Sequence, residues 1–104
     1  MTEKTEWEKI ENGRNVEKSS GETYYSYRHS AHPRIKIVAQ PNWLNEWFVY
    51  YTSPHRVMTI ARCYGEKDAR EYSQHVAMRV LPLANPLAEV RNIYTGEMKD
   101  SIFF

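Results

Sequence analysis

The stretch WFVYYTSPHRVMTIARCYGEKDAREYSQHVAMRVL, residues 47–81, changes its hydrophobic period at Gly65. Before Gly65, aromatic and β-branched residues flank a turn at Pro54, and this pattern predicts two strands joined as a hairpin. After Gly65, apolar residues recur at spacings of three, four and four, which is the stripe of an amphipathic helix. The stripe consists of Ala69, Tyr72, Val76 and Val80. The sequence therefore predicts a strand–turn–strand–helix unit.

Two more strands are predicted upstream of this unit, in ETYYSYRHS (residues 22–30) and in the alternating segment RIKIVAQ (residues 34–40). Downstream, Asn85 followed by Pro86 has the pattern of an N-cap and a first helical position, so a short second helix is expected through about Ile93. The expected fold is α+β. It has an antiparallel sheet of three to four strands packed on one main C-terminal helix, with a short second helix.

The chain of 104 residues has the length of one domain. Residues 1–21 are polar and charged and are predicted to form a flexible N-terminal arm. Residues 22–95 are expected to form the α+β domain, and residues 96–104 a C-terminal tail.

Cysteine usage and hydropathy predict a cytoplasmic protein without a membrane partner. Cys63 is the only cysteine, so no intramolecular disulfide can form, and this fits a reducing compartment. No apolar run approaches the roughly 20 residues of a membrane span. The first twenty residues lack the apolar core of a signal peptide.

Charge is distributed unevenly along the chain, although the net charge is only +1. Residues 23–65, which hold the predicted sheet, contain five Lys or Arg against Glu46 alone, a net charge of +4. Tyrosines are interleaved with these cations, and the chain has eight Tyr and three Trp in all. A basic, tyrosine-rich sheet favours binding of a polyanion.

Residues 34–80 resemble the three-stranded-sheet-plus-helix DNA-binding domains of plant AP2-type regulators and of the arm-binding domains of phage-type integrases. The matching segments are WFVYYTSPHR as an aromatic strand and turn, VMTIARCYG as its basic partner strand, and GEKDAREY as the start of the helix. The resemblance implies that the sheet face opposite the helix contacts the DNA major groove. It covers about half of the chain.

From the charge pattern and the resemblance, the first hypothesis is a small non-enzymatic nucleic-acid-binding domain, with DNA preferred, that uses its sheet. Arginine and lysine can contact phosphate, and tyrosine can stack on a base. The candidate residues are Arg28, Arg34, Lys36, Tyr50, Arg56, Arg62 and Tyr64. The alternative use of this surface is an ordinary half-exposed sheet with aromatic cross-strand pairs.

A second hypothesis is a small protein-binding inhibitor or adaptor, of the kind that phages and mobile elements encode, acting on a host protein. Short length, near-neutral charge and an apolar C-terminal end motivate it. Trp43 and Leu44 lie at a predicted turn, and Phe103 and Phe104 end the chain; these four are the candidate protein-binding residues. Exposed edge strands would also allow two copies to pair as a symmetric dimer.

Catalytic and metal-binding patterns are weak. His29 and His32 are three residues apart and could begin a zinc site with Cys63 or His55, but solvated loop histidines are the favoured interpretation. The cationic loop around them could instead contact phosphate. No nucleophile elbow, phosphate loop or HExxH motif occurs, so no enzyme activity, cofactor or metal is predicted.

Simple alternation along residues 56–64 assigns each side chain to one face of the sheet. Arg62 would be costly to bury, so it is expected to face away from the helix. Alternation then predicts Met58, Ile60 and Tyr64 on the same face as Arg62. It predicts Val57, Thr59, Ala61 and Cys63 under the helix.

Overall fold

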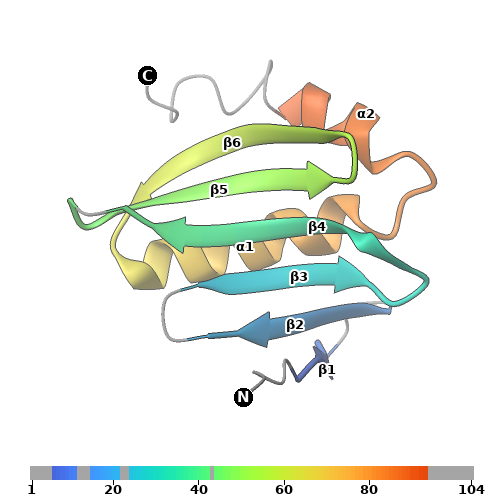
Figure 1. Ribbon diagram of the computed structural model, residues 1–104, viewed down its shortest axis with the longest axis horizontal. Coiled ribbons are helices and arrows are strands. Elements are labelled where there is room, and N and C mark those ends of the chain that lie inside the picture. The colour runs from blue at the N-terminus through green and yellow to red at the C-terminus, as the bar shows by residue number, and fades with distance from the viewer. Residues whose placement is uncertain (1–5, 12–14, 22–23, 43, 94–104) are drawn as a thin grey trace.

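The computed structural model describes residues 6–11, 15–21, 24–42 and 44–93. Within these ranges the chain forms one six-stranded antiparallel sheet, in which the strands follow one another in sequence order, and two helices (Figure 1). The strands are β1 (Glu8–Lys9), β2 (Val16–Ser20), β3 (Tyr25–His29), β4 (His32–Pro41), β5 (Glu46–Ser53) and β6 (Arg56–Tyr64). The helices are α1 (Glu66–Val80) and α2 (Pro86–Asn92). The α+β class and the antiparallel sheet are therefore confirmed.

The expected number of three to four strands was too low, because β1 and β2 extend the sheet beyond β3. Both come from the segment for which the sequence predicted a flexible arm. β2 is polar in sequence, but its first residue Val16 is fully buried and Ser19 is 4% exposed. β2 is held by antiparallel pairing with β3. Because backbone pairing does not depend on apolar side chains, the hydrophobic pattern of the sequence did not predict this strand.

Helix α1 packs across one face of the sheet, and the opposite face is turned towards the viewer in Figure 1. Gly65 precedes the helix with a φ of 92°, a conformation that side chains with a Cβ rarely adopt. The buried stripe of α1 consists of Ala69, Ser73, Val76, Ala77 and Val80. These small residues let the helix approach the sheet closely, over a core that includes Tyr27, Ile37 and Val49.

The predicted start of the second helix is confirmed. The Asn85 side chain accepts a hydrogen bond from the Ala88 amide at 3.3 Å, and Pro86 occupies the first turn of α2. In the part of the chain that the structure describes, neither helix is long and apolar enough to cross a bilayer.

A β-bulge at Ile60 changes which residues of β6 face the helix. Val49 lies opposite Ala61, but its neighbour Tyr50 lies opposite Thr59, so Ile60 is the extra residue of the bulge. Both Ile60 and Ala61 are buried in the core. The alternation of side chains between the two faces of the sheet is therefore interrupted at Ile60. Residues before and after the bulge follow opposite patterns.

The face assignment made by simple alternation was consequently right for one half of β6 and wrong for the other. Arg62 and Tyr64 lie opposite open-face partners on β5, whereas Ala61 and Cys63 face the helix, as predicted. Met58 packs against the core and Ile60 is fully buried, so neither lies on the uncovered face. Val57 and Thr59 lie on that face instead, and Val57 is 66% exposed.

Candidate nucleic-acid interface

The face of the sheet opposite α1, which we call the open face, is built from three parallel rows of paired residues. The first row consists of Ser26, Val38, Tyr50 and Thr59, and the second of Arg28, Lys36, Thr52 and Val57. The third consists of Gln40, Phe48 and Arg62, and Tyr64 lies beyond it on β6. Aromatic and basic side chains are thus interleaved across β3 to β6. No helix of the described residues covers this face.

Strand register brings five of the seven predicted nucleic-acid-binding residues to the open face. They are Arg28, Lys36, Tyr50, Arg62 and Tyr64. Arg34 lies on β4 between His32 and Lys36, where the register with β3 shifts, so cross-strand pairing does not assign it to a face. Arg56 does not lie on the open face. It lies opposite Ser53 beside the hairpin turn, and alternation from Val57 directs it to the other side of the sheet.

Trp7 is a member of this surface that sequence reasoning missed. The Arg28 guanidinium carbon lies 3.9 Å from the centroid of a Trp7 ring, and the Lys36 Nζ lies 5.9 Å from it. These are cation–π distances. The indole is only half-buried, so it adds an aromatic surface next to two cations. The sequence feature that could have drawn attention to Trp7 is that it is the only Phe, Trp or Tyr before Tyr24.

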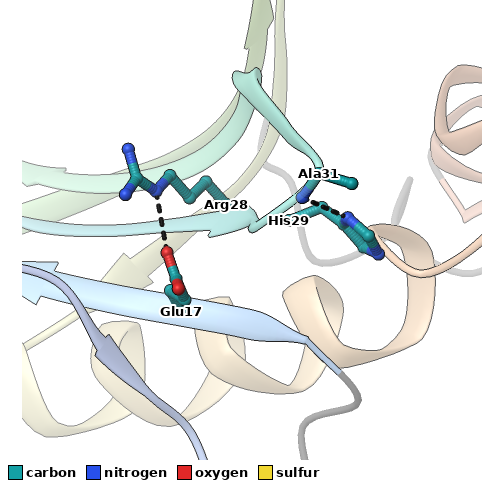
Figure 2. Close-up of polar contacts among 4 residues, drawn as sticks. All are labelled: Glu17, Arg28, His29 and Ala31. Carbon is teal, nitrogen blue, oxygen red and sulfur yellow. Dashed lines mark hydrogen bonds and ion pairs between the residues drawn. The ribbon is translucent and has the colours of Figure 1, made fainter.

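Carboxylates partly neutralise the open face. Glu17 on β2 accepts a hydrogen bond from Arg28 Nε on β3 at 3.1 Å, as Figure 2 shows. Glu46 lies 3.7 Å from an Arg62 nitrogen. Such partly exposed ion pairs usually stabilise a fold by about 0–1 kcal/mol, so a phosphate oxygen could replace the carboxylate at low cost.

Tyr50 is the central aromatic residue of the open face. It lies between Val38 and Thr59, and its hydroxyl hydrogen-bonds to the Gln40 side chain. Burial raises the pKa of Tyr50, so the phenol stays neutral at physiological pH. A neutral, positioned ring suits stacking on a base better than a phenolate, which would repel phosphate.

The two loop histidines lie together, with ring centroids 5.4 Å apart. The Nδ1 atom of His29 accepts a hydrogen bond from the Ala31 amide at 3.0 Å, so this nitrogen is used in shaping the β3–β4 turn (Figure 2). Among the described residues, no group of three or more His, Cys, Asp or Glu side chains is placed to hold a metal ion.

Of the candidate protein-binding residues, only Leu44 lies in the part of the chain that the structure describes. It precedes β5 and is 57% exposed. Trp43, Phe103 and Phe104 lie outside the described residues.

Cys63 faces the α1 side of β6 and is half-buried. Burial, and secondly the negative charge of Asp68, raise the pKa of the thiol. Since the thiolate is the reactive form, we expect iodoacetamide to alkylate Cys63 more slowly than free cysteine at pH about 8. The rate should rise in Asp68→Asn and rise further in urea. A folded protein that reacts as fast as free cysteine would contradict this assignment.

Comparisons of the chain with protein-family models, with curated proteins and with solved structures gave no match.

Proposed function

We propose that this protein is a non-enzymatic nucleic-acid-binding domain that holds a single strand across the open face. The observation that carries the proposal is the strand register, which gathers five of seven basic and tyrosine candidates on the one face that α1 leaves uncovered. Phe48 and Trp7 add aromatic surface among the same cations.

The chemistry of the open face matches the two needs of single-strand binding. Bases present flat π surfaces that stack on aromatic rings without regard to sequence, and the phosphates need nearby cations. Tyr50 and Tyr64 supply rings, while Lys36 and Arg62 supply cations on the same and neighbouring strands. Valine side chains between them, at Val38 and Val57, can contact the faces of bases or sugars.

The width of the sheet favours a single strand over the duplex that the AP2-type resemblance implies. Three strand spacings of about 4.8 Å separate β3 from β6, the strands of the open face, roughly 14 Å in total. A B-DNA major groove is only about 12 Å wide and admits a helix or a narrow β-ribbon. A broad sheet cannot enter the groove across its full width, whereas a flexible single strand can lie on it.

The proposal is tested by fluorescence anisotropy with labelled oligonucleotides of about 12 nucleotides, as single-stranded DNA, single-stranded RNA and duplex DNA. Titrations at about 50 and about 200 mM salt give the slope of log K against log salt. We expect tighter binding of a single strand than of duplex. With three to four phosphate contacts, the slope should be about −2 to −3. Absence of binding at the lower salt would remove the proposal.

Arg62 and Arg56 form a matched pair for a sharper test, because they lie on β6 but on opposite sides of the sheet. Arg62→Ala should weaken single-strand binding and make the salt slope shallower by about 0.7, the value for one lost phosphate contact. Arg56→Ala should leave both unchanged. The melting temperature of each variant should stay close to that of the wild type, because partly exposed charges contribute little to stability. Equal loss in both variants would show that binding depends on total charge and not on the open face.

The second candidate function, a small inhibitor or adaptor of a host protein, is favoured by one observation. Leu44 exposes 57% of its surface at the turn before β5, next to the predicted partner-binding residue Trp43. A pull-down from a lysate separates the two functions. A stoichiometric protein partner that survives nuclease treatment favours the second, and loss of every partner after nuclease favours the first.

A further inference from the structure

Strand β6 ends the sheet on the side away from β1. It is nine residues long, and no other strand in the described part of the chain pairs with its outer edge. Its two most exposed apolar side chains, Val57 and Tyr64, are 66% and 63% exposed. An open edge of this length presents backbone N–H and C=O groups to any extended chain.

An open cleft with a volume of about 540 Å³ lies beside this edge, between β6 and the first turns of α1. One side of it is formed by residues 61–64 of β6, and the other by Asp68, Glu71 and Tyr72 of α1. Hydrogen bonds hold the first turns of α1 to β3: the Tyr27 hydroxyl donates to the Arg70 carbonyl at 3.3 Å, and Tyr25 hydrogen-bonds to Glu66. The inner side of β6 near Cys63 is therefore only partly covered.

An edge strand beside a helix-lined cleft is the arrangement that binds peptides by strand addition. Backbone hydrogen bonds align the added strand, and every second side chain enters the cleft. Here the inward residues of β6 are Ala61 and Cys63, which are small enough to leave room for such side chains. The bulge at Ile60 twists the edge, so pairing is expected along residues 61–64, directly beside the cleft.

The charge of the cleft indicates which peptide fits. Asp68 and Glu71 supply carboxylates on the α1 side. Arg62 also lines the cleft, but its cation lies 3.7 Å from Glu46, so the two carboxylates of α1 leave the cleft negatively charged. Side chains entering the cleft therefore meet negative charge, and lysine or arginine at alternate positions would be complementary.

We propose that β6 and this cleft bind an extended basic segment of a partner protein, which adds a seventh strand to the sheet. A second copy of this chain would bring its own Asp68 and Glu71 to a symmetric β6–β6 contact, and the like charges would oppose pairing. The C-terminal residues of the chain carry Glu97 and Asp100 against Lys99, so their charge does not match the cleft either. The cleft adjoins the open face at the edge of β6, because Arg62 and Tyr64 line both.

The test uses the full chain and a synthetic peptide of about eight residues that alternates lysine and valine. Binding is measured by calorimetry in the absence of nucleic acid, so failure here leaves the nucleic-acid proposal untouched. Methylating alternate backbone nitrogens of the peptide keeps its charge but removes the N–H groups that would pair with β6, and should reduce affinity about tenfold or more. The double variant Asp68→Asn/Glu71→Gln should cause a similar loss. The control Glu8→Gln, an exposed carboxylate on β1 at the opposite edge, should cause none.

Four results would overturn the proposal. The first is no binding of the lysine–valine peptide, and the second is equal affinity for the peptide and its backbone-methylated form. The third is a wild-type dimer, detected by sedimentation, that Tyr64→Lys dissociates, because the edge would then belong to a second copy. The fourth is a rise of about tenfold in peptide affinity in Phe103→Ala/Phe104→Ala, which would assign the cleft to the chain's own C-terminal residues.

Discussion

Ile60→Ala is expected to lower the free energy of unfolding by about 2–5 kcal/mol, the usual cost of removing a large aliphatic side chain from a packed core. Ile60 is fully buried because the bulge directs it, with its neighbour Ala61, towards α1. The matched variant Val57→Ala removes an aliphatic side chain three residues away that is 66% exposed. It should change stability by no more than about 0.5 kcal/mol.

Urea unfolding followed by circular dichroism measures both variants against the wild type. The pair tests the bulge itself, because unbroken alternation along β6 would place Val57 under the helix and Ile60 on the open face. A larger loss of stability from Val57→Ala than from Ile60→Ala would show that β6 has no bulge and that its first half faces the other way.

Tyr50→Ala is expected to weaken binding of a single-stranded oligonucleotide by about 5- to 150-fold, which corresponds to the 1–3 kcal/mol of one base–aromatic stack. Tyr50 has this role because it lies in the middle of β5, between neighbouring residues of the open face on β4 and β6. Tyr50→Phe keeps the ring and removes only the hydroxyl that bonds to Gln40, so it should retain most of the affinity.

The measurement is anisotropy at low salt, with circular dichroism to show that both variants stay folded. If Tyr50→Ala binds like the wild type, stacking at the centre of the open face is refuted. If Tyr50→Phe loses as much affinity as Tyr50→Ala, the hydroxyl and not the ring is the contact, and the interface would recognise its ligand by hydrogen bonding.

The central strands and α1 could be predicted because their apolar side chains recur with a clear period, and α2 because Asn85 and Pro86 mark its start. Ile35, Ile37 and Ala39 mark β4 in this way, and the helical spacing from Ala69 to Val80 marks α1. The polar strand β2 could not be predicted, because pairing with β3 and the burial of Val16 hold it in place, and neither produces a period.

The bulge at Ile60 could not be predicted from the sequence either. No glycine or proline, the residues that most often mark an irregular strand, occurs within residues 56–64. The bulge is required by the global packing, which buries Ile60 and Ala61 together against α1.

The candidate interface was predictable in residue type but not in full membership. Alternation and charge identified Lys36, Tyr50 and Arg62, and the register of neighbouring strands placed them on one face. Arg56 is also basic but lies on the other side of the sheet. Its side depends on which residues of β6 face α1 in the half of the strand before the bulge. Trp7 could not be assigned, because its contact with Arg28 joins residues from distant parts of the sequence.

Methyl NMR spectroscopy tests the central claim, that the open face binds a single strand, most directly. Val38 and Val57 carry methyl groups on the open face, and Val76 and Val80 carry them in the core beneath α1. On titration with a single-stranded oligonucleotide of about 12 nucleotides, we expect the methyl resonances of Val38 and Val57 to shift and those of Val76 and Val80 to stay in place. If the protein is saturated with the oligonucleotide and the methyl resonances of Val38 and Val57 stay in place, the open face is not the binding surface.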